Sequence, residues 1–385
     1  MKKSSTEQRN ARDIEVINNT ISRRCFLQAA MLFGTSAALG GFLVSCGGGG
    51  GGGGSRDEGG KSDSLTGIRI LDAHAHPDRF HNPTSTVVDN SSTLEAIIAM
   101  RMAASAAAAV GDVRFISTGI SGQDEYASTI TQLNRALSAN NAGRVKLVGT
   151  TADIPLASGP GVPPGMILAV EGGDALMGEA SRCDDLYALG VRMITIVHYR
   201  NNQLGDIMFP QAGLDPGPYS GGLTETGRRA IERMQALGIV VDVAHASTAT
   251  LGNMVAMTAK PLIDSHTSLA PGNTAGPTRL RTWAEMELIA QTGGVVCLWP
   301  LATDTRRTFA DWAAEILAIK QHIGIEHVGL GTDGGGALPA MITGYTGISD
   351  LGSLADAMLN AGLTQQDLAA FFGGNLLRVL RECID

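Results

Sequence analysis

The chain has 385 residues, of which 44% are hydrophobic and 17% are charged, and its formal net charge is −8. This composition supports a sizeable buried core and argues against a largely disordered chain. No cluster of basic residues is visible, and phosphate groups require a positive surface, so we expect no nucleic-acid partner.

Residues 1–46 have the pattern of an export signal. Arg23 and Arg24 precede an uncharged run of apolar and small residues, which is typical of a targeting segment and not of a core helix. The arginine pair resembles a bacterial twin-arginine signal, and Leu43–Cys46 resembles a lipobox, whose cysteine is acylated. We therefore expect an exported protein, lipid-anchored at the bacterial cell envelope on its periplasmic or outer face. The alternative is an uncleaved transmembrane anchor, because the run is about long enough to span a bilayer.

Residues 47–66 are predicted to form a flexible tether between this anchor and the rest of the chain. The segment opens with eight consecutive glycines, Gly47–Gly54, and such a run behaves as flexible coil. Residues 67–385 then form one predicted domain. The three cysteines in it are too far apart to suggest a disulfide framework or a zinc knuckle, so we expect buried thiols.

From residue 68 onward, short apolar runs typical of strands alternate with runs of helical pattern. Strands are predicted at residues 68–71, 114–118, 145–150, 166–171, 193–198, 239–245, 262–266, 294–299 and 327–333. Helices are predicted at residues 92–109, 125–139, 224–237, 248–258, 285–291 and 308–322, and from residue 351 to the end. Continuous apolar strands that alternate with helices indicate parallel strands covered by helices.

This alternation predicts an α/β fold, a (β/α)8 TIM-like barrel. Eight strands close such a barrel, which leaves the strand at 145–150 as the extra one. A doubly wound open sheet is the alternative, but that fold usually has a glycine-rich phosphate loop after its first strand. Here the first strand ends in His74 and His76 instead.

Polar residues with metal-binding chemistry stand at the ends of the predicted strands. They are His74, His76, Glu171, His198, His245, His266 and Asp333. The C-terminal strand ends of a parallel barrel converge on one face, and that face holds the active site. His74 and His76 are two residues apart, so they point to the same side of a strand. Imidazole and carboxylate ligands favour zinc, although manganese, iron or cobalt would also fit.

Each of these residues alone also has a structural interpretation. A histidine at a strand end can simply be hydrogen-bonded, and Glu171 could accept hydrogen bonds from the amides that follow it. Asp333 could cap the glycine turn Gly334–Gly336. Unrelated structural roles would not all fall at strand ends. We therefore interpret the set as the site of a metal-dependent hydrolase.

Several segments together resemble the membrane (renal-type) dipeptidase family of zinc peptidases, family M19, within the metal-dependent amidohydrolase-like barrels. In the family's order they are LDAHAHPD, AVEGGDAL, LGVRMITIVHYRNN, GGLTETGRRAIERMQALGIVVDVAHAS, PLIDSHTS, HVGLGTDGGG and GLTQQDLAAFFGGNLLRVL. The resemblance implies a dipeptidase that hydrolyses short peptides with a metal-activated water. It also implies two zinc ions per chain and a possible homodimer.

The resemblance implies specific metal ligands. His74 and His76 would bind the first zinc ion, Glu171 would bridge the two ions, and His245 and His266 would bind the second. The family usually has His-x-Asp at the first strand, whereas this chain has His-x-His. A neutral imidazole lowers the negative charge at the first ion, so we expect weaker binding there or a changed metal preference.

The resemblance also implies groups that act on the substrate. Asp333 would carry a proton, and His198 would contact the substrate carbonyl and the tetrahedral intermediate. Arg279 would hold the terminal carboxylate of the substrate, with Arg281 in reserve, because a guanidinium meets a carboxylate with two hydrogen bonds. Gly334–Gly336 replace a second-acid pattern after Asp333, which bears on substrate preference.

Two other functions remain open at this point. The chain could be another barrel-type hydrolase that acts on an amide, lactam or ester. It could also be a non-catalytic, lipid-tethered protein that binds a ligand or a partner.

Overall fold

The computed structural model describes residues 63–82, 93–113, 122–210, 214–274, 278–336, 338 and 340–385. The chain separates into two units, Met1–Gly53 and Gly54–Asp385, and every described residue belongs to the second. The predicted export signal, the glycine run and the predicted strand at 114–118 lie outside the described residues. Within the described part, no helix is both long enough and apolar enough to cross a membrane.

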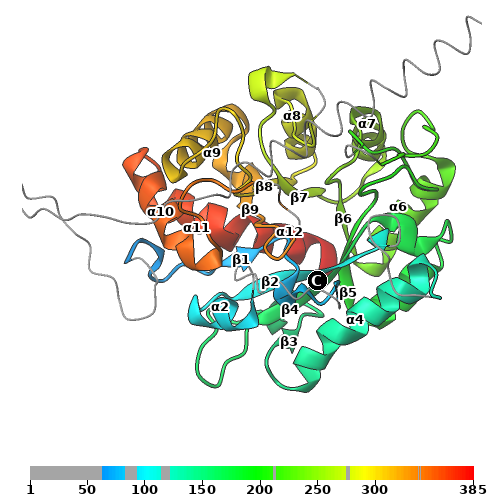
Figure 1. The fold of residues 1–385 in the computed structure, drawn as a ribbon, viewed down its shortest axis with the longest axis horizontal. Coiled ribbons are helices and arrows are strands. Elements are labelled where there is room, and N and C mark those ends of the chain that lie inside the picture. The colour runs from blue at the N-terminus through cyan, green and yellow to red at the C-terminus, as the bar shows by residue number, and fades with distance from the viewer. Residues whose placement is uncertain are drawn as a thin grey trace, which may run out of the picture. The chain divides into compact units, whose positions relative to one another are not determined.

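The described strands form one parallel sheet in the order β1-β2-β4-β5-β6-β7-β8-β9 (Figure 1). Their bounds are β1 Leu71–Asp72, β2 Ala104–Val110, β3 Lys146–Leu147, β4 Gly165–Glu171, β5 Val191–Thr195, β6 Val240–Asp242, β7 Ile263–Thr267, β8 Val295–Leu298 and β9 Val328–Leu330. Strand β3 lies off this path and pairs with β4. The Ala73 amide donates to the Leu330 carbonyl at 3.0 Å, which joins the first strand to the last. The predicted barrel is confirmed, and β3 is the extra strand.

Helices surround the strands, as Figure 1 shows. They are α2 Leu94–Ala99, α4 Glu125–Asn141, α5 Arg182–Ala188, α6 Glu225–Leu237, α7 Thr248–Met257, α8 Trp283–Gln291, α9 Phe309–Ile323, α10 Leu351–Asn360, α11 Gln365–Ala369 and α12 Asn375–Ile384. Thr282 and Thr308 begin α8 and α9 with capping boxes, which satisfy backbone donors at the helix starts. The predicted C-terminal helix is interrupted into α10, α11 and α12.

The hydrophobic core has an inner and an outer layer. The inner layer fills the barrel, and side chains of α12, among them Val379 and Leu380, pack into it against the first residues of β6, β7 and β8. Helix α12 therefore covers the N-terminal end of the barrel. The outer layer lies between the strands and the surrounding helices. The opposite, C-terminal end of the strands is left for polar groups.

The predicted helix at 92–109 is wrong over its second half. Helix α2 ends at Ala99, and the alanine-rich residues 104–110 form β2, which is buried along its whole length. Alanine has the highest helix propensity, and a uniformly apolar run carries no period that separates a helix from a buried strand. Pairing with β4 along the full strand decides the outcome. Strand β2 therefore takes the barrel position that the prediction gave to 114–118.

A fully buried arginine ties the ends of two strands together. Arg281 Nε donates to Asp264 Oδ2 at 2.6 Å, and its other nitrogens donate to the carbonyls of Val243 and Ala246 at 2.5 and 2.7 Å. Burial raises the pKa of Asp264 to about 6, although Arg281 opposes this shift. Arg281 thus fixes the segment that follows β6 against β7.

We expect Arg281→Met to lower the free energy of unfolding by about 3–5 kcal/mol, because it leaves Asp264 as a buried carboxylate without its cation. Urea denaturation measures this change. The control is Arg233→Met, which breaks the exposed ion pair with Asp184 and should change stability little. Equal, small effects of the two substitutions would contradict this role for Arg281.

Candidate metal centre

The seven residues named from the strand ends come together at the C-terminal end of the barrel. His74 and His76 follow β1, Glu171 ends β4, His198 follows β5, His245 follows β6, His266 lies in β7 and Asp333 follows β9. All are buried except Asp333, whose side chain is 12% exposed. The barrel thus collects residues that lie up to about 260 positions apart in the sequence at one place.

The carboxylate of Glu171 lies at the centre of this group. Its Oε1 atom is 3.1 Å from Nε2 of His245, 3.3 Å from Nε2 of His198 and of His266, and 3.5 Å from Nε2 of His74. Its Oε2 atom is 3.5 Å from Nε2 of His76. Five imidazoles therefore face one carboxylate. With no hydrogen on these nitrogens, their lone pairs would face the carboxylate oxygens, an arrangement that positive charge between them would stabilise.

The pKa values in the centre follow from burial and from these close contacts. Burial opposes ionisation of Glu171, yet the rings of His198 and His74 hold its pKa well below the ordinary value. Burial also disfavours the charged form of His74, but the adjacent Glu171 carboxylate raises the His74 pKa to about 9. Burial lowers the pKa of His266 to about 3 and that of His245 well below its usual range. Neutral imidazoles beside an ionised carboxylate are the forms that bind a metal ion.

The donor atoms form groups that could hold a metal ion. Three groups of ligand atoms each lie within 4.8 Å of one another, namely His74 with His76 and Asp333, His74 with Glu171 and His266, and Glu171 with His198 and His245. Nε2 of His74 is buried and has no hydrogen-bond partner among the described residues. A buried ring nitrogen of this kind is satisfied when it binds a metal ion. His74 and Glu171 each belong to two groups, as shared or neighbouring metal sites require.

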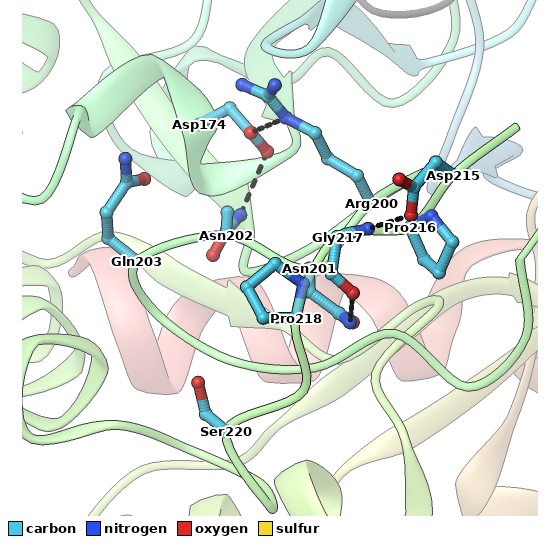
Figure 2. Close-up of a pocket in the computed structure, with 10 residues that line it drawn as sticks. All are labelled: Asp174, Arg200, Asn201, Asn202, Gln203, Asp215, Pro216, Gly217, Pro218 and Ser220. Carbon is cyan, nitrogen blue, oxygen red and sulfur yellow. Dashed lines mark hydrogen bonds and ion pairs between the residues drawn. The ribbon is translucent and has the colours of Figure 1, made fainter. Parts of the chain in front are cut away.

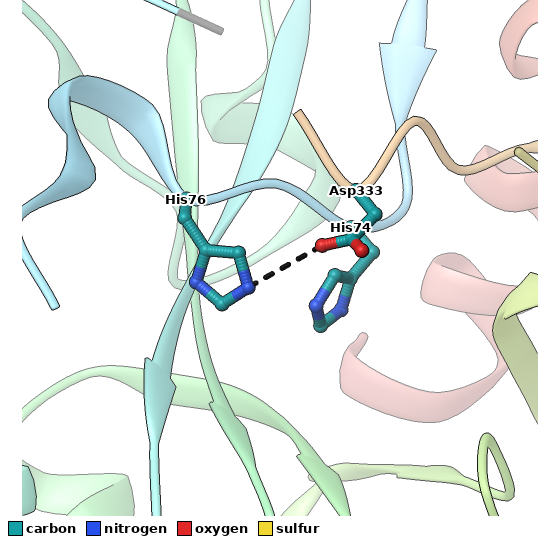
Figure 3. Close-up of side chains that lie close together, drawn as sticks. All are labelled: His74, His76 and Asp333. Carbon is teal, nitrogen blue, oxygen red and sulfur yellow. Dashed lines mark ion pairs between the residues drawn. The ribbon is translucent and has the colours of Figure 1, made fainter. Parts of the chain in front are cut away.

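The glycines after Asp333 allow its loop to lie against the His-x-His segment. Figure 3 shows Asp333 beside His74 and His76, and Asp333 Oδ1 is 3.5 Å from Nε2 of His76. A Cβ atom at Gly335 would collide with the His76 carbonyl, and one at Gly336 would collide with the Asp333 carboxylate. Gly335 also has a φ of +80°, which favours glycine. The glycines are thus explained by close packing around the centre.

Two residues of the centre have a strained backbone. His245 has a φ of 66° and Asp333 has a φ of 48°, a region that residues with a Cβ rarely adopt. Non-glycine residues keep such conformations only where the surrounding structure enforces them, and these positions cluster at functional sites. The strained backbone therefore indicates that the directions of the His245 and Asp333 side chains are important for the site.

Sequence reasoning missed a layer of buried groups beneath the histidines. Ser265 Oγ lies 2.9 Å from Nδ1 of His266 and 3.3 Å from Nδ1 of His74, and it donates to Asp242 Oδ2 at 2.7 Å. Asp72 accepts from the amide of His74 and from Thr332. These contacts orient the rings of candidate ligands. A signal was present in the sequence, because an aspartate stands two or three positions before several of the histidines.

Two more residues near the centre were not named from the sequence. The carboxylate of Asp112, just after β2, lies 2.8 Å from Nδ1 of His198. His81 lies beside the His-x-His segment, with its ring centroid 4.3 Å from that of His76. Burial, together with the neighbouring His76, lowers the His81 pKa to about 2. No pattern in the sequence pointed to either residue.

The two candidate arginines lie in different surroundings. Arg281 is fully buried and engaged with Asp264 and with main-chain carbonyls, as described above. Arg279 is half-buried, donates to the carbonyl of His198 at 3.2 Å and lies 4.2 Å above the ring of Tyr199. Arg279 therefore contacts the segment that carries His198, whereas Arg281 has a structural role.

A polar pocket of about 490 Å³ lies next to this segment (Figure 2). Its lining includes Asp174, Arg200 and Asn202. Asp174 binds Arg200 Nε at 2.7 Å and Asn202 Nδ2 at 2.9 Å. Burial, with a contribution from Asp112, raises the pKa of Asp174 to about 6. Asp174 and Arg200 are thus already used to hold the loop that follows His198.

Known proteins with similar sequences include dipeptidases. Dipeptidase aclJ of Aspergillus oryzae is 32% identical over 228 residues, which are 56% of this chain and 51% of that protein. Dipeptidase tcpJ of Claviceps purpurea is 26% identical over 227 residues, 57% of this chain and 51% of that protein. The chain therefore spans about half the length of the curated relatives it matches.

Solved structures show the same fold at low sequence identity. A metallo peptidase from Rhodobacter sphaeroides, liganded with a phosphinate mimic of the dipeptide L-Ala-D-Ala, aligns with a TM-score of 0.67 at 18% identity. That alignment covers 82% of this chain and 99% of the other. The probable dipeptidase PvdM from Pseudomonas aeruginosa also has a TM-score of 0.67, at 18% identity, over 82% of this chain and 95% of the other.

The family model for membrane dipeptidases matches residues 70–384. This range begins at β1, ends in α12 and contains all seven residues of the centre. On this match, the chain belongs to the membrane dipeptidase family, peptidase family M19.

Proposed function

We propose that this protein is a metal-dependent dipeptidase that hydrolyses the peptide bond of short peptides. The observation that carries the proposal is the convergence of five imidazoles on the buried Glu171 carboxylate. Divalent cations bound by such groups activate water for attack on an amide carbonyl. Family membership and the dipeptidases among the relatives support the choice of peptide bonds.

The metal ligands in this proposal are His74, His76, Glu171, His245 and His266. Zinc is the proposed metal, with two ions per chain, because zinc accepts both imidazole and carboxylate ligands. Glu171 is the proposed bridge, since its carboxylate lies 3.1–3.5 Å from rings assigned to both ions, those of His74 and His76 and those of His245 and His266. With His76 in place of a carboxylate, the first ion is expected to bind more weakly than the second.

Two further residues act on the peptide in this proposal. Nε2 of His198 faces the centre beside Glu171 Oε1, where it can contact the substrate carbonyl oxygen as negative charge develops. Asp333 lies near His76, and desolvation raises the pKa of its carboxyl group. A raised pKa suits a group that holds a proton and passes it to the leaving amine.

Arg279 is the proposed partner of the free C-terminal carboxylate of the substrate. It lies over Tyr199 and beside the main chain of His198. A guanidinium at this place would set the distance between the carboxylate and the scissile bond. This arrangement would limit the substrate to short peptides with a free C-terminus.

Outside the described domain, we propose export by the twin-arginine route and a lipid anchor at Cys46. The supporting observations are the arginine pair and the lipobox-like end in the sequence. A small peptide would then be the substrate at the cell envelope. A homodimer is proposed from the family resemblance alone.

The zinc-loaded protein is expected to hydrolyse dipeptides with a free C-terminus and to leave C-terminally amidated dipeptides almost intact. Treatment with a chelator should abolish the activity, and zinc should restore it. A chromatographic assay with L,L-dipeptides, D-containing dipeptides, amides and lactones measures this. Hydrolysis of lactones or lactams without dipeptide hydrolysis would instead support another barrel-type hydrolase.

Arg279→Met provides the matched variant for this assay. It should raise KM for free dipeptides and reduce the discrimination against amidated ones, because the carboxylate partner is lost. Arg378→Met is the control, since Arg378 contacts Gly293, Glu326 and Glu382 and none of the residues of the centre. Unchanged discrimination in Arg279→Met would contradict the assignment.

Replacement of both Arg23 and Arg24 by lysine is expected to stop export through the twin-arginine route. Cell fractionation with an antibody against the folded domain measures where the protein accumulates. Normal export of the double variant would contradict this part of the proposal. The control is Arg9→Lys, which lies upstream of the pair.

A further inference from the structure

Strand β2 carries no side chain that the sequence marked as functional, yet it contacts two histidines of the centre. The Ala108 carbonyl lies 2.7 Å from Nδ1 of His76. Just beyond the strand, Asp112 Oδ1 lies 2.8 Å from Nδ1 of His198. Strand β2 therefore contacts one imidazole through its main chain, and the segment just after it contacts another through a carboxylate.

Asp112 is held in place by close packing against the end of β4. Val110 pairs with Glu171, and the Gly111 amide donates to the Glu171 carbonyl at 2.7 Å. A Cβ atom at Gly111 would collide with the carbonyl of Gly172. Glycine at this position therefore lets the chain turn closely over β4. The turn places the carboxylate of Asp112, which is fully buried, behind His198.

Both oxygens of Asp112 accept hydrogen bonds from consecutive residues. Oδ1 faces Nδ1 of His198, and Oδ2 accepts from the Tyr199 amide at 2.9 Å. Carboxylate oxygens accept hydrogen bonds, so in this contact Nδ1 of His198 carries the hydrogen. Nε2 is then the ring nitrogen that faces Glu171 Oε1, at 3.3 Å. The ring cannot turn over without breaking a buried hydrogen bond to a charged group.

The segment after His198 is anchored in the same way by a second carboxylate. Asp174, which follows β4, binds Arg200 and Asn202 (Figure 2). Two buried aspartates from neighbouring strand ends thus hold the loop that begins at His198. Asp112 differs from Asp174 in that it bonds the ring of a residue that faces the centre.

We propose that Asp112 is a positioning residue that fixes the ring of His198 with Nε2 toward the metal centre. Only the expected effect of Asp112 on turnover rests on the proposed function. The hydrogen bond from His198 Nδ1 to Asp112 can be tested without any substrate. The chemistry is that of a carboxylate that orients a histidine in a metal site, where loss of the partner costs about 10–100-fold in activity.

The test variant is Asp112→Asn, which keeps the shape of the side chain. The Tyr199 amide can only donate, so it claims the single oxygen of the new amide. The NH2 group then faces Nδ1 of His198, which loses its acceptor. In the zinc-loaded protein labelled with 15N-histidine, the Nδ1-bound proton of His198 should disappear, while that of His76 should remain. His198→Ala assigns the resonance.

Turnover gives a second measure that a purely structural role would not reproduce. Asp112→Asn should lower kcat for a dipeptide by about 10–100-fold with unchanged metal content. In the His198→Ala background, Asp112→Asn should cause no further loss of kcat, because Asp112 acts through His198. Asp367→Asn, a buried aspartate at the start of α11, is the matched control. It should leave both kcat and the His198 resonance unchanged.

Two results would overturn the proposal. One is a His198 Nδ1-bound proton that persists in Asp112→Asn. The other is an added loss of kcat when Asp112→Asn is combined with His198→Ala. If the unmodified zinc-loaded protein cleaves no dipeptide, the proposed function fails, and the nuclear magnetic resonance measurement still decides the role of Asp112.

Discussion

The structure of the centre depends on one buried carboxylate that attracts positive charge. Glu171 ends β4, and nitrogen atoms of five imidazoles lie 3.1–3.5 Å from its oxygens. A buried carboxylate is costly unless cations and hydrogen bonds compensate its charge. Protonation of His74 provides part of that charge, and its raised pKa reflects the same attraction. Divalent cations would compensate the charge of Glu171 more completely, because they would also bind the neutral imidazole rings.

The rest of the barrel supplies the rigidity that this arrangement requires. A metal site needs each imidazole held with the correct ring nitrogen toward the centre. Ser265 and the main chain of β2 hold individual rings, and Arg281 fixes the segment after β6. Helix α12 covers the opposite end of the barrel with apolar side chains. Polar and apolar interiors are thus separated along the barrel axis, which allows a charged centre within a folded domain.

The sequence was sufficient to predict the barrel and to name the residues that converge on its C-terminal end. Each strand that leads to a histidine or to Glu171 carries an apolar run just before that residue or a few positions upstream of it. The prediction failed at strand β2, because a uniform alanine run has no hydrophobic period and alanine favours helices in isolation. Asp112 was missed for the same reason, since β2, the strand before it, was predicted to be helical. The layer of Ser265 and Asp242 could not be ranked from one sequence, because buried serine and aspartate side chains also form hydrogen bonds with purely structural roles.

The metal content of Glu171→Gln tests the central claim most directly. The amide keeps the shape of the side chain but removes the negative charge that holds the centre together. Elemental analysis of the zinc-dialysed protein should give two metal ions per chain for the unmodified protein. The variant should lose most of this metal while its circular dichroism remains that of a folded barrel. Full metal occupancy in Glu171→Gln would contradict the account, because the histidines would then hold the ions without the carboxylate.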